Sequence, residues 1–125
     1  MKIISINIRG LGRGYKWKYL KGILDKETVD MICIQETKVH DLQPSSCYNL
    51  WGGNNIDWVI KHAVGNSGGI LTMWNKDKFK CVKQVVGNMY IGVLGEFYST
   101  INAIPIPVAI FNVYSSCVLN EKVSL

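Results

Sequence analysis

Residues 30–38 read Asp-Met-Ile-Cys-Ile-Gln-Glu-Thr-Lys. Four consecutive apolar residues, Met31 to Ile34, run directly into Gln35 and the carboxylate of Glu36. Short apolar runs of this kind are typical of strands that are buried on both faces of a sheet. A charge at the end of such a strand needs water, a cation or a metal ion as its partner. The function of this chain therefore depends on which of these partners Glu36 meets.

The residues before this stretch predict that it closes a βαβ unit. Residues 2–8 are rich in isoleucine and end at the turn-forming sequence Arg-Gly-Leu-Gly. Between residues 16 and 26, apolar side chains recur at helical spacing, with lysines on the opposite face. A strand over 29–35 then fits a right-handed parallel crossover. Asn7 and Glu36 would lie at the carboxyl ends of two parallel strands, where open α/β sheets bind ligands.

The second part of the chain predicts mainly antiparallel strands. We expect a polar connection through Pro44-Ser45-Ser46, followed by short strands that are separated by glycine and asparagine turns. Residues 52–55 (Gly-Gly-Asn-Asn) and 87–88 (Gly-Asn) are predicted to be turns between antiparallel neighbours. The expected strands are residues 57–62, 69–74, 79–86, 89–98 and 108–114.

Composition restricts the class of protein and its setting. The 125 residues, 48% of them apolar, predict one globular domain or part of one. The formal charge of +5 favours a polyanionic partner such as nucleic acid, although ordinary soluble surfaces also carry such an excess. Four widely spaced cysteines argue against a zinc site or a disulfide framework, and Cys33 is expected in the core. No stretch is apolar enough to span a membrane, and we expect an intracellular protein of the nucleus or cytoplasm.

Five motifs follow one another along the chain. They are Ser5-Ile-Asn-Ile-Arg-Gly-Leu11, Ile34-Gln-Glu-Thr-Lys38, Asp57-Trp58, Ser67-Gly-Gly-Ile-Leu71 and Phe111-Asn-Val-Tyr-Ser115. Together these motifs resemble the endonuclease/exonuclease/phosphatase family. More narrowly, the chain is similar to the apurinic-endonuclease-type domain at the start of plant LINE-like, non-LTR retroelement polyproteins. The resemblance implies an α/β sandwich of the DNase I-like type and hydrolysis of DNA phosphodiesters with Mg²⁺ (or Mn²⁺).

The resemblance also implies roles for single residues. Glu36 matches the metal-binding glutamate, and Asn7 matches the asparagine beside the metal, with both a metal-binding and a catalytic role. Tyr114 matches the tyrosine near the scissile phosphate, where a phenol can donate to developing charge. Substrate-binding roles are implied for Arg9, Lys38, Ser67, Gly68 and Gly69.

Each of these residues also has a structural interpretation. Asn7 would serve as a strand-ending turn residue, and Glu36 as a surface carboxylate that pairs with Lys38. Tyr114 would be half-buried structure, and residues 67–69 a loop that enters a strand. The basic residues between Arg9 and Lys21 would bind phosphates or form the solvated face of a helix.

Two family motifs do not occur in this sequence. They are Gly-Asp-Phe-Asn and Ser-Asp-His, which supply water activation and the acid–base histidine, and neither His40 nor His62 is a convincing substitute. We therefore expect residues 1–125 to be the N-terminal portion of one domain. The expected fold is an incomplete α/β sandwich, one βαβ unit followed by mainly antiparallel strands, with the strands of roughly one sheet present.

Enzymatic activity is left open by the sequence, and we expect little or none from these residues. The alternatives are a non-catalytic nucleic-acid-binding module with DNA as its partner, or a degenerate reading frame with no selected function. Uncovered sheet edges and apolar faces also predict self-association.

Overall fold

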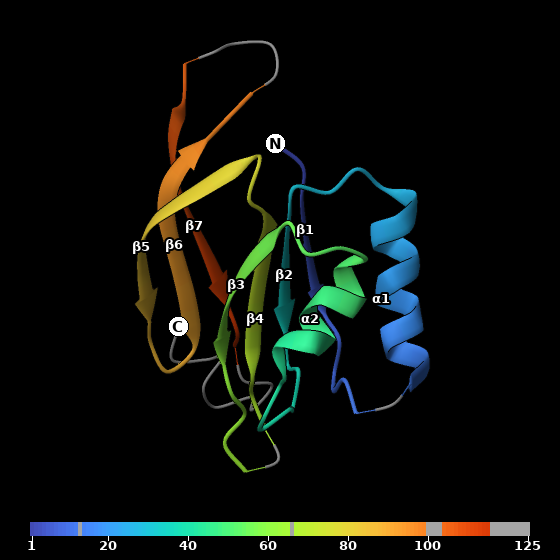
Figure 1. Ribbon diagram of the computed structural model, residues 1–125. Helices are drawn as coiled ribbons and strands as arrows, with labels where there is room; N and C mark the ends of the chain where they lie inside the picture. The colour runs from blue at the N-terminus through green and yellow to red at the C-terminus, as the bar shows by residue number, and fades with distance from the viewer. Residues whose placement is uncertain (13, 66, 100–103, 116–125) are drawn as a thin grey trace.

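A computed structural model describes residues 1–12, 14–65, 67–99 and 104–115. Two β-sheets pack face to face, and two helices lie on the outer face of one of them (Figure 1). The four-stranded sheet has the order β1-β2-β4-β3 and the three-stranded sheet the order β5-β6-β7. The elements are β1 (Ile3–Asn7), α1 (Gly14–Lys26), β2 (Met31–Gln35), α2 (Pro44–Trp51), β3 (Ile56–Lys61), β4 (Ile70–Asn75), β5 (Phe79–Val86), β6 (Tyr90–Phe97) and β7 (Ile106–Val113).

The predicted βαβ unit is confirmed. β1 pairs in parallel with β2, and α1 forms the connection between them. Leu20 is fully buried, and Trp17 and Leu24 pack against the same core, as the helical spacing predicts. The helix begins at Gly14, two residues before the predicted start, within the usual uncertainty of helix ends.

The prediction of a polar connection after Leu42 is wrong, because the chain forms the helix α2 there. A proline occupies the first turn, where the missing N–H costs no hydrogen bond. Cys47 and Leu50, three residues apart, are buried against the core. Gly52 ends the helix with φ +88°. The predicted hairpin turn over 52–55 is therefore also wrong, since Gly52 caps a helix and does not join antiparallel strands.

The antiparallel strands are confirmed, with small shifts of their ends. β3 and β4 pair with each other, and β4 also pairs with β2. In the second sheet, Gly87 N–H donates to Tyr90 O at 2.9 Å in the predicted turn between β5 and β6. A bulge follows Cys81, opposite Gly95, where an added Cβ would lie only 1.9 Å from Lys80 O. Glycine is required there because the two backbones approach so closely.

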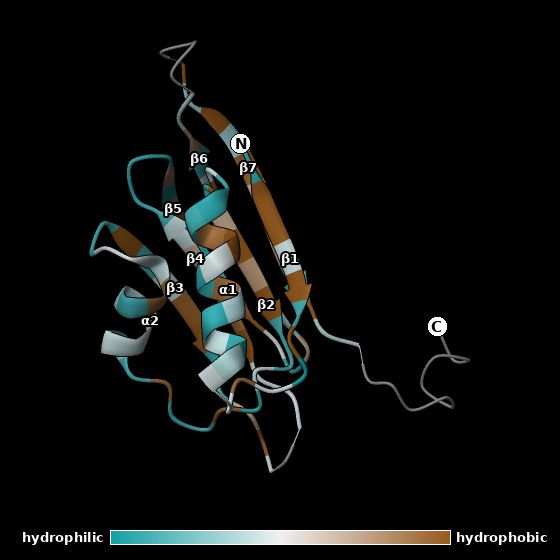
Figure 2. Cartoon of the chain, turned by 90° about the vertical axis from the view of Figure 1, so that its right-hand side faces the viewer, coloured by the Kyte–Doolittle hydropathy of each residue, from teal (hydrophilic) through white to brown (hydrophobic). Residues whose placement is uncertain are grey.

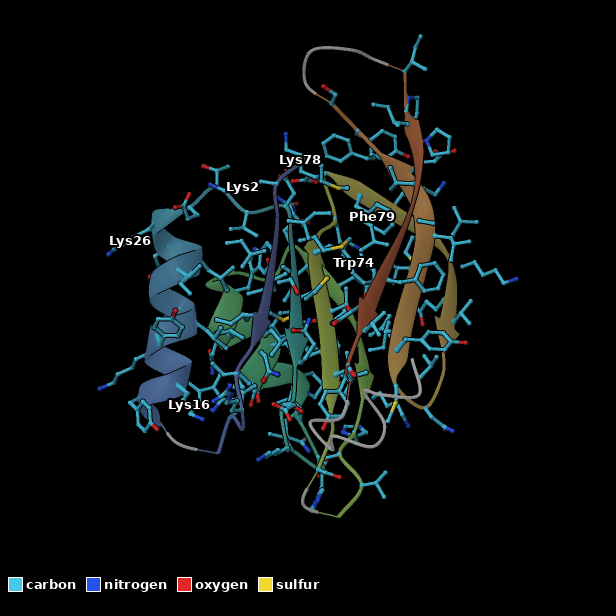
Figure 3. All side chains as sticks on the ribbon, turned by 180° about the vertical axis from the view of Figure 1, so that it is seen from behind. Lys2, Lys16, Lys26, Trp74, Lys78 and Phe79 are labelled. Carbon is cyan, nitrogen blue, oxygen red and sulfur yellow. The ribbon has the colours of Figure 1, made fainter. Side chains whose placement is uncertain are left out.

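The chain contributes strands to both sheets of the sandwich, so the prediction of roughly one sheet is wrong. One core lies between the helices and the four-stranded sheet, and a second core lies between the two sheets. In the second core, the rings of Trp74 and Phe79 meet edge to face at 5.6 Å (Figure 3). All five residues of β2 are buried, as its apolar run predicts.

One side of the sandwich ends in two strand edges. β1 is the last strand of its sheet and β7 the last strand of the other. Figure 2 shows that apolar residues make up much of the strands. Ile3, Phe111 and Val113 are exposed although they are large and apolar. The predicted uncovered apolar residues are therefore present in this part of the chain.

Two further predictions concern the cysteines and the membrane. Cys33 and Cys47 are buried, and burial raises the pKa of both thiols to about 11, which fits core residues and not reactive thiols. Within the described ranges, neither helix has the length and apolar character needed to cross a membrane.

Candidate active site

Three neighbouring strand ends form the floor of the candidate site. β1 ends at Asn7 and β2 ends just before Glu36, whereas the antiparallel β4 begins just after Gly69. In the strand register, Asn7 lies opposite Gln35 and Gln35 lies opposite Ile70. The ends of β1 and β2 thus lie next to the start of β4, and this brings Asn7, Glu36 and Gly69 to one end of the molecule.

Main-chain hydrogen bonds join these three chain segments beyond the strands. Gly10 N–H donates to Glu36 O at 2.6 Å, and Lys38 N–H donates to Gly68 O at 2.9 Å. The loops after β1 and β2 and the loop before β4 are therefore held in one arrangement. A site built on bonded backbone is positioned more precisely than one on free loops.

Gly69 is required by a close approach inside the protein. Thr37 N–H donates to Gly69 O at 3.1 Å, and a Cβ added at Gly69 would lie 2.1 Å from Thr37 Oγ1. Its φ of +90° also favours glycine. Ser67, by contrast, is exposed beside it. The small residues of this motif thus have a structural cause in addition to the substrate approach implied by the resemblance.

Backbone strain is concentrated at the candidate site. Among the described residues, the non-glycine positions with positive φ are Arg9 (+53°), Glu36 (+55°) and Lys38 (+55°). Such conformations cost roughly 1–3 kcal/mol each and cluster at functional sites. All three residues belong to the two loops that follow β1 and β2.

The Glu36 carboxylate has no protein partner in the described part of the chain. The residue is only 8% exposed, and neither a hydrogen bond nor an ion pair involves its side chain there. No enclosed side-chain oxygen in these ranges lacks a partner, so the carboxylate oxygens must reach solvent. The alternative interpretation, pairing with Lys38, is therefore wrong. A carboxylate that belongs to a nearly buried residue, has no protein partner in the described ranges and opens to solvent is suited to binding a cation.

Asn7 makes the contact of a turn residue. It is exposed, and its Oδ1 accepts a hydrogen bond from Arg9 N–H at 3.1 Å. In the described residues its amide nitrogen makes no hydrogen bond, so that group remains available beside the strand end.

Beneath this floor, a polar network connects the two sheets. Gln35 Nε2 donates to Asn112 Oδ1 at 2.7 Å and to Ser5 Oγ at 3.0 Å. Asn112 Nδ2 donates to Leu71 O and to Thr72 Oγ1, both at 3.0 Å. No role of Gln35 or Asn112 was predicted from the sequence. The available signal was an asparagine at an inward position of the otherwise apolar β7.

Tyr114 lies beside the Ser-Gly-Gly element. Its N–H donates to Met89 O at 2.8 Å, which extends the β6–β7 pairing by one residue. The half-buried tyrosine shares a cavity of about 220 Å³ with residues 67–69 and with His62. Because Gly68 O accepts a hydrogen bond from Lys38 N–H, this cavity adjoins the loop that carries Glu36.

Cationic side chains surround the same end of the sheet. Arg9 and Lys38 are both exposed. Lys16 Nζ donates to Ile8 O at 3.0 Å and to Arg9 O at 2.7 Å, which ties the first turn of α1 to the loop after β1. Lys16 contacts the main chain of Arg9 and not its side chain. The exposed guanidinium of Arg9 therefore remains available next to the strand ends.

Some motif residues lie elsewhere. Asp57 is at the start of β3, where it pairs with Trp74, one register position from Asn75 at the end of β4. It therefore lies at the opposite end of the sheet from Gly69. Its Oδ1 accepts from Trp58 N–H at 2.9 Å. His40 hydrogen-bonds Gly65 O in the loops near the site. Arg13 lies outside the described residues.

Comparison with known proteins shows similarity in structure but not in sequence. Neither a protein-family model nor a curated protein sequence matches this chain. The AP endonuclease LMAP of Leishmania major matches with TM-score 0.60 and 14% identity, over 91% of this chain and 40% of that one. The APE2 catalytic domain of Xenopus laevis matches with TM-score 0.65 and 17% identity, over 98% and 47% of the two chains. A humanized TDP2 of D. rerio gives TM-score 0.57 and 16% identity, over 98% and 51%.

These matches define the fold class. The chain has an incomplete α/β sandwich of the DNase I-like type, as predicted. It spans between 40% and 51% of the length of the three solved structures. At 14–17% identity the similarity concerns the fold, so the chemistry must be argued from the site.

Proposed function

We propose that this chain provides part of a nuclease site that hydrolyses phosphodiester bonds of DNA with a divalent metal, Mg²⁺ or Mn²⁺. The observation that carries the proposal is the carboxylate of the nearly buried Glu36, which is unpaired within the described residues, opens to solvent and lies where three strand ends meet. Two structures that share the fold are described as an AP endonuclease and an APE2 catalytic domain, which supports DNA as the substrate.

The residues present fit a hard divalent cation. In the described part of the chain no three acidic, histidine or cysteine side chains form a cluster, which argues against an all-protein metal cage. Mg²⁺ does not need one, because it is often held by one or two carboxylates and completed by water and substrate phosphate. Glu36 would hold the metal, and the Asn7 amide would orient a neighbouring water or phosphate oxygen. Bound there, the metal would supply Lewis-acid stabilisation of the phosphoryl group.

The other side chains would bind and orient the substrate. Arg9 and Lys38 are exposed cations at the strand ends and would hold the DNA phosphates. Tyr114 would donate a hydrogen bond to negative charge that develops on the phosphate. An added Cβ at Gly68 would meet no heavy atom within 4 Å, so this position faces open space, and its lack of a side chain would let DNA approach this edge.

We expect low activity from this chain, and we propose that it comes from a retroelement. The Gly-Asp-Phe-Asn and Ser-Asp-His motifs do not occur in this sequence, so these 125 residues should bind metal and DNA but cleave slowly or not at all. We assign the chain to the N-terminal portion of a retroelement-type endonuclease that acts in the nucleus or cytoplasm. Genomic sequence beyond the last codon that encodes both motifs would support this assignment, and unrelated sequence would argue against it.

Metal binding tests the proposal independently of catalysis. Titration of the protein with Mn²⁺, followed by electron paramagnetic resonance, should give one site that Glu36→Gln weakens about ten-fold or more. Asp25→Asn, which removes an exposed carboxylate of α1, should leave the titration unchanged. Equal Mn²⁺ affinity in the wild type and Glu36→Gln would refute the metal site.

Nicking of supercoiled plasmid tests the predicted inactivity. With Mg²⁺ we expect no nicking above a control without protein. Nicking that Glu36→Gln abolishes would show that the catalytic group is more complete than proposed. Salt-sensitive DNA binding without Mn²⁺ binding would instead favour the non-catalytic module.

A further inference from the structure

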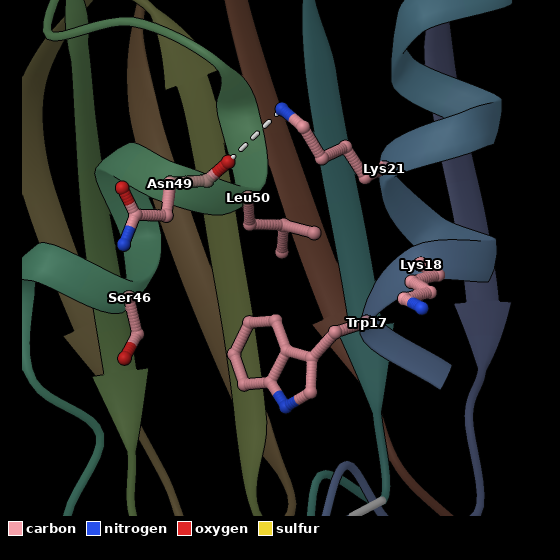
Figure 4. A pocket seen from close by; sticks show the side chains of 6 residues that line it. All are labelled: Trp17, Lys18, Lys21, Ser46, Asn49 and Leu50. Atoms are coloured by element: carbon pink, nitrogen blue, oxygen red, sulfur yellow. Dashed lines mark hydrogen bonds between the residues drawn. The ribbon is translucent and has the colours of Figure 1, made fainter. Parts of the chain in front are cut away.

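A groove between α1 and α2 has no role in the proposed reaction. Its volume is about 250 Å³, and it is on the helix-covered face of the four-stranded sheet (Figure 4). Figure 4 shows the indole of Trp17 extending from α1 towards α2, near Leu50 and opposite Ser46. The lining residues are Trp17, Lys18, Lys21, Ser46, Asn49 and Leu50.

The groove combines an aromatic wall with positive charge. The half-buried Trp17 supplies apolar surface, with the buried Leu50 behind it, and neither aspartate nor glutamate is among the lining residues. Lys18 is exposed and has no carboxylate partner within the described ranges, where Lys2 and Glu27 form the ion pair. Lys21 Nζ donates to Asn49 O at 3.2 Å, so two of its three N–H donors remain for a ligand. These groups suit a ligand with a flat apolar part and a negative charge.

We propose that this groove binds a nucleotide of single-stranded nucleic acid. The base would stack on the Trp17 indole, and its phosphate would contact Lys18 and Lys21. The Ser46 hydroxyl and the Asn49 amide offer hydrogen bonds to the base edge. A base paired within a duplex cannot enter, so the groove selects single strands or unpaired ends.

The groove is connected to the candidate active site through α1. Lys16 Nζ donates hydrogen bonds to the carbonyl oxygens of Ile8 and Arg9. In the helix, Lys16 is followed directly by Trp17 and Lys18. Along α1, Lys21 lies only about 7.5 Å beyond Lys16. A strand whose phosphate contacts Arg9 can therefore continue along the helix towards the groove. The inference extends the proposed nucleic-acid function, but the groove shares no residue with the site around Glu36.

Fluorescence anisotropy with a short fluorescein-labelled oligothymidylate and the full 125-residue chain tests the inference. Trp17→Leu should weaken binding roughly ten-fold, and Trp17→Phe should retain most of it because the stacking surface remains. Lys18→Ala should weaken binding several-fold. Lys26→Ala removes one charge from the other end of the same helix and should change affinity less than about two-fold. Circular dichroism checks that each variant is folded.

The outcomes separate this inference from the proposed function. Equal weakening of oligonucleotide binding by Lys18→Ala and Lys26→Ala would overturn the groove proposal, because only the net charge of the protein would then matter. Unchanged affinity in Trp17→Leu would also overturn the groove proposal. If Trp17→Leu does not fold, Lys18→Glu decides, and wild-type affinity in that variant refutes the groove. The Mn²⁺ titration does not involve the groove, so either proposal can fail alone. Displacement of the oligonucleotide by thymidine monophosphate would show that free nucleotides also bind, and no displacement would assign the groove to strands.

Discussion

The two sheets differ in what covers their outer faces. The four-stranded sheet has helices on one face and the second sheet on the other, and every residue of β2 is buried. Among the described residues, the three-stranded sheet is covered on one face only, and Phe111 and Val113 of β7 remain 53% and 60% exposed. Strand ends are fixed most firmly where both faces are packed. The candidate site accordingly sits on the ends of the covered sheet, and the exposed sheet contributes Tyr114 from its margin.

The strongest test of this contrast compares one aromatic residue from each environment. Trp74 is 1% exposed and packs on Phe79, so Trp74→Ala should lower the free energy of unfolding by about 3–5 kcal/mol. Phe111→Ala, on the uncovered face, should cost about 1 kcal/mol or less. Urea unfolding measures both values. Similar losses would mean that the outer face of the second sheet is covered in solution.

The connection between the sheets is tested at Asn112. Asn112→Ala should cost about 2–3 kcal/mol of unfolding free energy, because Leu71 O and the Gln35 amide then lose buried partners. Asn54→Ala, at an exposed position, serves as the control and should change stability by less than about 0.5 kcal/mol. A loss no greater than that of the control would show that water replaces the network.

The close approach at the strand ends is tested at Gly69. Gly69→Ala should cost roughly 1–3 kcal/mol, because the new methyl group meets Thr37 Oγ1 at a positive φ. Gly12→Ala is a suitable control, since no heavy atom lies within 4 Å of its added Cβ. Thermal unfolding of the two variants provides the comparison, and equal melting temperatures would contradict the prediction.

The smallest change in stability, about 0.5 kcal/mol or less, is expected for Val113→Lys on the uncovered face. The same change should reduce self-association in sedimentation velocity, because lysine is unfavourable at an edge-to-edge contact. Tyr15→Lys, at an exposed position of α1, should leave self-association unchanged. A wild-type protein that stays monomeric at high concentration would refute self-association itself.

The local features of the fold could be predicted from the sequence. The apolar run before Gln35 and the helical spacing of Trp17, Leu20 and Leu24 are signals within one segment, and they specify the βαβ unit. The α2 helix was not predicted because only Cys47 and Leu50 are buried in it, which is too few for a clear period.

The features that depend on distant contacts could not be predicted. The bond between Gln35 and Asn112 joins residues 77 positions apart, and no local pattern shows which sheet β7 enters. The roles of Asn7, Glu36 and Tyr114 came from motif resemblance. The βαβ pattern predicted that Asn7 and Glu36 lie at the same strand ends, and the parallel pairing of β1 and β2 is observed, whereas the position of Tyr114 beside the Ser-Gly-Gly element depends on contacts between distant segments. The position of the Asp57-Trp58 motif, away from the other motifs, also depends on pairing between distant strands and could not be predicted.

The left-handed backbone at Arg9, Glu36 and Lys38 suggests a trade-off between stability and function. Glycine would adopt these conformations with less strain, yet each position carries a long charged side chain. Replacing any of the three by glycine should therefore leave the fold as stable or slightly more stable while removing a charge from the strand ends. A selection experiment for thermal stability alone would be expected to favour glycine at these positions, and selection for binding of DNA or metal would be expected to remove it.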